Sequence, residues 1–122
     1  MVEPKTKSKA KRILEKWQKE LELENWYIRI IWEKDEIMNE AWNKSHKRKN
    51  RGAITGDVVC DPIGRRGFIR INEDYIDWKN VETVLLHELL HIRIIEDNEP
   101  ENDREWIVDN LTEVLLNGES KL

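Results

Sequence analysis

The stretch TVLLHELLHIRII, residues 83–95, decides how the rest of the sequence is interpreted. It is almost wholly apolar, yet it carries two histidines and a glutamate, His87, Glu88 and His91. Residues four apart on a helix lie on one face, so His87 and His91 point the same way. Glu88 is turned about 100° around the helix axis from His87. Two explanations stand: the histidines are buried and hydrogen-bonded, or they bind a ligand.

The order His-Glu-x-x-His is the zincin signature, in which two imidazoles hold one zinc ion and the glutamate acts as general base. A Zn–N bond measures about 2.0–2.1 Å, and two imidazoles one helical turn apart can converge on one ion at that distance. Random shuffling of this composition would produce the motif about once in 150 sequences, so the motif suggests a zinc site without proving it. A third ligand would separate a metal centre from a chance match.

The next helical segment offers that third ligand. If residues 81–96 and 100–117 fold into an antiparallel hairpin centred on residue 98, Glu105 lies level with His91 and Asp109 lies level with His87. Glu105 would complete a His₂Glu site with an open fourth position, which a catalytic zinc requires. Asp109 would accept the remaining N–H of His87 and fix the orientation of that ring.

These acidic residues also have a simpler explanation. Glu105 and Asp109 share a helical face with Glu101 and Glu113, so all four could form a solvated surface. The register that matches both histidines favours the metal-binding interpretation. Glu101 is an alternative third ligand, but it lies one turn away from the level of the histidines.

Hydrophobic spacing predicts a single α+β domain of two layers, in which helices cover one face of a three-stranded sheet. The segment around the histidines is apolar nearly all round the helix, so neighbours should cover more than one of its sides. Residues 1–8 are predicted to form a flexible tail, and residues 9–118 to form the domain. Within the domain, the predicted helices are 9–23, 81–96 and 100–117, and the predicted strands are 25–32, 53–59 and 68–72. Residues 60–67 are predicted to form a turn, and residues 33–52 to be irregular.

The last helix is expected to pack through an apolar stripe and to stop at Gly118, because glycine commonly ends helices. The stripe consists of Ile107, Val108, Leu111, Val114 and Leu115.

HELLH followed by EWIVD resembles the two-motif pattern of gluzincin metallopeptidases, which carry HExxH on one helix and ExxxD on the next. The short gap between the motifs, and strands that lead directly into the active helix, resemble the minimal members called minigluzincins and small metallopeptidases encoded by phages and prophages. The likeness covers residues 25–117 in the order of elements, but only residues 87–109 carry specific motifs. The glycine and third histidine of metzincins are missing, and so are the larger subdomains of full-length gluzincins.

The resemblance implies a zincin-like fold and peptide-bond hydrolysis at one zinc ion. His87, His91 and Glu105 would bind zinc, Glu88 would serve as base and acid, and Asp109 would support His87.

Substrate binding and oxyanion stabilisation are less well defined by the sequence. An extended peptide would add to a free strand edge, and the strand at 67–72 is the candidate because it leads into the active helix. The oxyanion-stabilising group stays open among Tyr75, Tyr27 and His46, of which Tyr75 is nearest in sequence to that helix.

Two functions of different classes therefore remain. The first is a small zinc endopeptidase, and the second is a metal-stabilised regulatory or binding protein of phage or prophage origin, latent or non-catalytic. The metal site is the same in both functions, so metal binding does not separate them. A Glu88→Gln variant does, because it should keep zinc and lose cleavage only if the protein is an endopeptidase.

The composition indicates a cytoplasmic protein, and the family resemblance implies a peptide or protein substrate as its partner. One cysteine, Cys60, excludes an internal disulfide, and its simplest role is that of a small buried hydrophobe. The N-terminus lacks the apolar stretch of a signal peptide, and no run is long enough to cross a membrane. The oligomeric state is left open.

Charge is unevenly distributed along the chain. Residues 1–72 hold 17 Lys/Arg and 11 Asp/Glu, whereas residues 73–122 hold 4 and 14. The basic half includes a cluster of four cations at 47–51. Nucleic-acid binding by this cluster is less favoured than a solvated loop, because no aromatic interleaving or recognition motif accompanies it.

Overall fold

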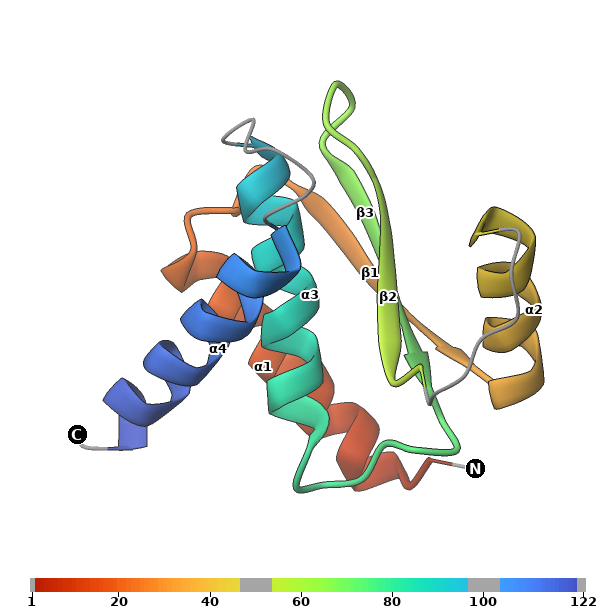
Figure 1. Cartoon of the computed structure of the whole chain (residues 1–122). Coiled ribbons are helices and arrows are strands. Elements are labelled where there is room, and N and C mark those ends of the chain that lie inside the picture. The colour runs from red at the N-terminus through yellow and green to blue at the C-terminus, as the bar shows by residue number, and fades with distance from the viewer. Residues whose placement is uncertain (1, 47–53, 97–103, 121–122) are drawn as a thin grey trace.

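The computed structural model describes residues 2–46, 54–96 and 104–120, without the side chains of 42–46, 96, 104–107 and 118–120. In this part of the chain, four helices and one three-stranded sheet form a small α+β domain (Figure 1). The elements are α1 (Pro4–Glu20), β1 (Tyr27–Glu33), α2 (Asp35–His46), β2 (Gly56–Asp61), β3 (Arg66–Asn72), α3 (Val81–Glu96) and α4 (Arg104–Ser120). None of the described helices is both long and apolar enough to cross a membrane.

The sheet has the strand order β1-β3-β2. β1 runs parallel to β3, and β2 runs antiparallel to β3. β3 is therefore the central strand, and the expectation that residues 67–72 form a free edge is wrong. Chain order alone suggested that edge, but β3 pairs on both sides, and the free edges belong to β1 and β2.

α3 lies at the centre of the domain, as its apolar sequence predicts. α1, α3 and α4 lie on one side of the sheet (Figure 1). Leu85, Leu89 and Ile92 of α3 are fully buried together with Ile69 and Ile71 of β3. Because α1, α4 and the sheet all cover α3, a helix that is apolar nearly all round is stable here.

α2 corrects the prediction that residues 33–52 are irregular. Residues 35–46 form a helix on the other side of the sheet from α3 (Figure 1). Asp35 and Glu36 place negative charge in its first turn, where the helix dipole favours it. Met38 is fully buried and anchors the helix.

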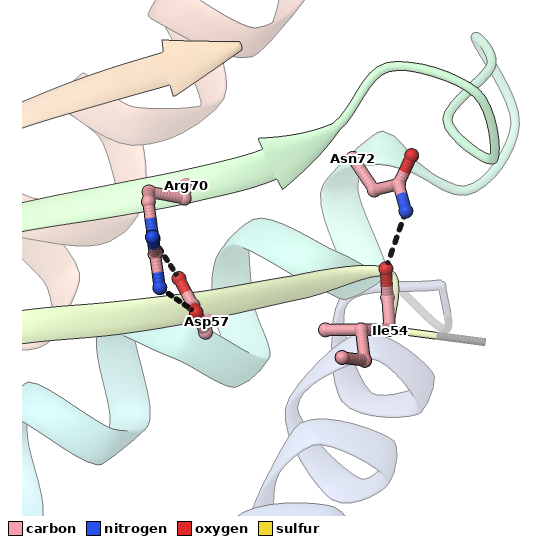
Figure 2. Close-up of polar contacts among 4 residues, drawn as sticks. All are labelled: Ile54, Asp57, Arg70 and Asn72. Carbon is pink, nitrogen blue, oxygen red and sulfur yellow. Dashed lines mark hydrogen bonds and ion pairs between the residues drawn. The ribbon is translucent and has the colours of Figure 1, made fainter. Parts of the chain in front are cut away.

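The buried side chain of Asn72 joins the end of β3 to the start of β2 and to α2. Its Nδ2 donates to Asp35 Oδ1 at 2.8 Å and to the carbonyl oxygen of Ile54 at 2.8 Å, and Figure 2 shows the second of these bonds. Its Oδ1 accepts from the backbone N–H of Asp74. These contacts satisfy the amide and hold the three segments together.

A second contact in Figure 2 joins β2 and β3 across the sheet. Asp57 and Arg70 are direct partners in the register, and Arg70 Nε donates to Asp57 Oδ1 at 2.7 Å. The hydrogen bond and charge of Asp57 raise the pKa of Arg70 above its usual value. The contact joins directly opposite positions of β2 and β3 and helps to fix the register of the β2–β3 hairpin.

The N-terminus is more ordered than predicted. α1 begins at Pro4, so residues 4–8 form its first turns, and the prediction of a flexible tail over 1–8 is wrong for them. Proline is favoured at the first helical position, and Val2 and Thr6 are buried against the domain.

α4 also differs from the prediction in its packing. Val108 and Thr112 are buried, whereas Leu111 and Val114 are exposed. Thr112 can be buried because its hydroxyl donates to the Val108 carbonyl at 2.7 Å. The helix continues past Gly118 to Ser120, so the predicted stop is wrong.

Candidate metal centre

His87 and His91 lie one turn apart in α3 and converge on one point, as the spacing predicts. Their Nε2 atoms are 3.3 Å apart, and the two ring planes meet at 68°. α3 is buried on several sides by α1, α4 and the sheet, so its backbone holds the two rings in a fixed relation. His87 is only partly buried, so one side of the pair is open to solvent.

The separation of the two nitrogens fits a zinc ion. Two ligands at about 2.0–2.1 Å from a tetrahedral zinc stand about 3.3–3.4 Å apart. The same distance also suits a direct hydrogen bond between the rings, which is the simpler role that the sequence allowed. The pair can therefore hold one proton or one cation between the two nitrogens.

Asp109 of α4 contacts the other nitrogen of His87. The distance from His87 Nδ1 to Asp109 Oδ1 is 3.3 Å, and 67% of the aspartate side chain is exposed. A proton on Nδ1 directed at this carboxylate would make Nε2, which faces His91 Nε2, the unprotonated nitrogen of the ring. The hairpin register inferred from the sequence predicted this contact, and its role in orienting a ligand remains a prediction.

The third predicted ligand, Glu105, lies in α4 one turn before Asp109. α3 and α4 pack together and run in opposite directions (Figure 1), and the match of Glu105 with His91 remains a prediction. The side chain of Glu105 and the whole of Glu101 lie outside what the structure describes. Among the side chains that it does describe, no group of three His, Cys, Asp or Glu residues could hold a metal ion.

Glu88 points to a different neighbour from the histidines. It is 5% exposed and lies beneath β2, where an ideal Cβ on Gly56 would be 3.7 Å from Glu88 Cγ. The same Cβ would approach Val84 Cγ1 to 2.9 Å. Gly56 thus allows β2 to pass close to α3 at the glutamate, a role that the isolated glycine in the strand pattern signals.

The structure describes the side chains of two oxyanion candidates from the sequence, Tyr75 and Tyr27. Tyr75 is 46% exposed; its backbone N–H donates to the Asn72 carbonyl, and its own carbonyl accepts from Asn80 Nδ2. Tyr27 starts β1, at the opposite edge of the sheet from β2. The side chain of His46 and the basic cluster at 47–51 lie outside the described residues. Cys60 is partly buried and packs against the core.

Comparisons with known proteins add no assignment to this geometry. No protein family matches the chain, and neither a curated protein nor a solved structure is similar to it.

Proposed function

We propose that this protein is a zinc-dependent peptide hydrolase of the gluzincin type, with a zincin-like fold. The observation that carries the proposal is the 3.3 Å separation of the His87 and His91 Nε2 atoms on a buried helix. In this proposal, His87, His91 and Glu105 bind one zinc ion, Glu88 is the general base and acid, and Asp109 orients His87.

The residues divide the chemistry between two sides of α3. A bound zinc ion would polarise a peptide carbonyl and lower the pKa of water at the site toward about 7. Glu88 takes a proton from the attacking water and passes it to the leaving amine. Because Glu88 is only 5% exposed, bulk water has little access to its carboxylate.

The free edge of β2 is the proposed substrate site, in place of residues 67–72. In the described part of the chain, β2 pairs with β3 alone, and it passes over Glu88 at Gly56. A peptide that adds to this edge as a further strand would run along the side of the sheet that is nearest to the general base.

The test combines zinc binding with peptide cleavage. The purified, chelator-treated protein should take up one zinc ion per chain, measured by elemental analysis and by titration. Zinc-loaded wild type should cleave members of a broad peptide library. The Glu88→Gln variant should retain zinc and melting temperature but lose cleavage by a factor of about 10² or more.

Glu113→Gln is the matched control, because it removes an exposed carboxylate of α4 and should leave cleavage unchanged. Zinc uptake together with equal inertness of wild type and Glu88→Gln would reject the hydrolase and favour the metal-stabilised regulatory protein. Absence of zinc uptake would reject both.

A further inference from the structure

A second concave surface lies between α1 and the free edge of β1. It is a cavity of about 300 Å³, and α1 and β1 provide all of its lining. The lining residues are Lys7, Lys11 and Leu14 of α1 with Ile28, Arg29, Ile30 and Trp32 of β1. The strand order places this groove at the opposite edge of the sheet from β2 and Glu88, so it is separate from the candidate metal centre.

The backbone of β1 is available for pairing along this groove. Tyr27 N–H donates to the Arg65 carbonyl, and the Glu33 carbonyl accepts from Glu73 N–H. Odd-numbered residues of β1 therefore direct their backbone groups toward β3. The backbone groups of Ile28, Ile30 and Trp32 point the other way, toward the free edge, where the described part of the chain places no strand.

The chemistry of the groove is selective. Its floor is apolar, with Leu14 and Ile28 buried and Ile30 and Trp32 partly buried. Its exposed rim carries three cations, Lys7, Lys11 and Arg29, and no acidic residue belongs to the lining. Lys7 Nζ lies 5.8 Å from the centroid of the Trp32 ring, so its charge is held over the floor.

The geometry points to a docking site for an extended acidic segment of a partner protein, which adds to the β1 edge as a fourth strand. The open backbone groups would hold the main chain of that segment, and alternate apolar side chains would cover the floor. Carboxylates on the segment would face the three rim cations. Charge complementarity disfavours a basic segment, and the open backbone groups of β1 together with the apolar floor favour a peptide over a nucleic acid.

Cations beside an edge strand can also serve to prevent edge-to-edge aggregation of the sheet. That use predicts no affinity for any peptide. Binding experiments on the full chain therefore separate docking from protection.

The probe is a fluorescein-labelled heptapeptide in which glutamate and valine alternate, followed by fluorescence anisotropy at fixed salt. The double variant Lys7→Glu with Lys11→Glu should weaken binding about tenfold or more. The control Arg12→Glu with Lys19→Glu makes the same charge change at exposed positions of α1 outside the groove, and should change affinity less than twofold. Circular dichroism confirms that both variants fold.

Backbone pairing is tested on the peptide rather than on the protein. Methylation of alternate peptide nitrogens blocks hydrogen bonding from one edge of an added strand only. One of the two alternately methylated peptides should lose binding about tenfold, and the other should retain it. Equal affinity of the two, or equal loss, would overturn strand addition.

Three further results would overturn the proposal: no binding, equal binding of a peptide with lysine in place of glutamate, and tighter binding of single-stranded oligonucleotide. The protein could instead fail to bind the peptide and associate with itself through this edge. Self-association in sedimentation experiments that the Lys7→Glu and Lys11→Glu double variant abolishes would assign the groove to a second copy of the chain. A His87→Ala variant should bind the peptide like wild type, so the result stands apart from the zinc proposal.

Discussion

The contact between His87 and Asp109 gives the sharpest test of the metal centre. Replacing Asp109 by alanine removes the carboxylate that faces His87 Nδ1 and leaves both imidazoles in place. Partners of this kind typically change metal affinity 10–100-fold. The 3.3 Å distance is longer than the 2.7–2.9 Å of a strong charge-assisted bond, and most of the carboxylate is exposed. We therefore expect the lower end of that range, about tenfold weaker zinc binding, or about 1.4 kcal/mol.

The folding free energy should hardly change, because a contact made by a mostly exposed carboxylate contributes at most about 1 kcal/mol. Zinc affinity is measured by competition with a chromogenic chelator, at one pH and one ionic strength. Glu113→Ala removes an equal charge one turn further along α4 and controls for the general electrostatic field. His87→Ala sets the scale for loss of a ligand. If Asp109→Ala weakens zinc no more than Glu113→Ala does, Asp109 does not orient His87.

Further predictions concern stability and are checked by urea denaturation. Gly56→Ala should lower the free energy of unfolding by about 1–3 kcal/mol, because the new Cβ meets Val84 Cγ1 at 2.9 Å and the Arg70 carbonyl at 3.2 Å. Gly67→Ala should lower it less, because the nearest atom to the new Cβ is the end of the Ile92 side chain, Cδ1, at 3.0 Å. Leu89→Ala should lower the free energy of unfolding by about 2–5 kcal/mol, whereas Val114→Ala, at an exposed position, should change it by no more than about 0.5 kcal/mol. Equal losses of stability in the two variants would contradict the assignment of Leu89 to the core. Asn72→Ala should cost about 1–3 kcal/mol, because it leaves the Ile54 carbonyl without its amide partner.

The sequence was sufficient where local pattern and packing agree. The bounds of α3 match the prediction because an apolar run of helical length leaves little choice of structure. The contact of His87 with Asp109 followed from the register of an antiparallel hairpin. Both results follow from the 3.6-residue period of the helix, applied within α3 and between two helices that are consecutive along the chain.

α2 was missed because its stabilising contacts are distant in sequence. The Asp35 backbone N–H donates to the Asp74 carboxylate, and the Asp35 side chain accepts from Asn72. Its own apolar residues are too few to give a clear helical stripe. A helix of this kind is fixed by tertiary contacts rather than by its own pattern.

The strand order could not be read from the chain either. β1 and β3 pair in parallel although α2 and β2 lie between them in the sequence. The alternation of apolar residues defines which side of each strand faces the core, but it carries no information on which strand is central. The free edge was therefore assigned to the wrong strand.

The inward face of α4 was misjudged for a related reason. Leu111 and Val114 are apolar and follow helical spacing, but Thr112 occupies the buried position. A threonine that bonds to the carbonyl one turn earlier on its own helix can replace an apolar residue, and hydrophobic pattern alone does not detect this.

The observed strand order also gives the two proposals a common structural basis. A central β3 leaves one free edge on each side, and the two edges differ in what lies next to them. β2 passes over Glu88, whereas β1 borders a groove with three cations. A peptide held at β2 would reach the general base, while one held at β1 would be two strands away from it. A partner docked at β1 can therefore bind together with a substrate at β2, because neither edge needs the backbone groups that the other uses.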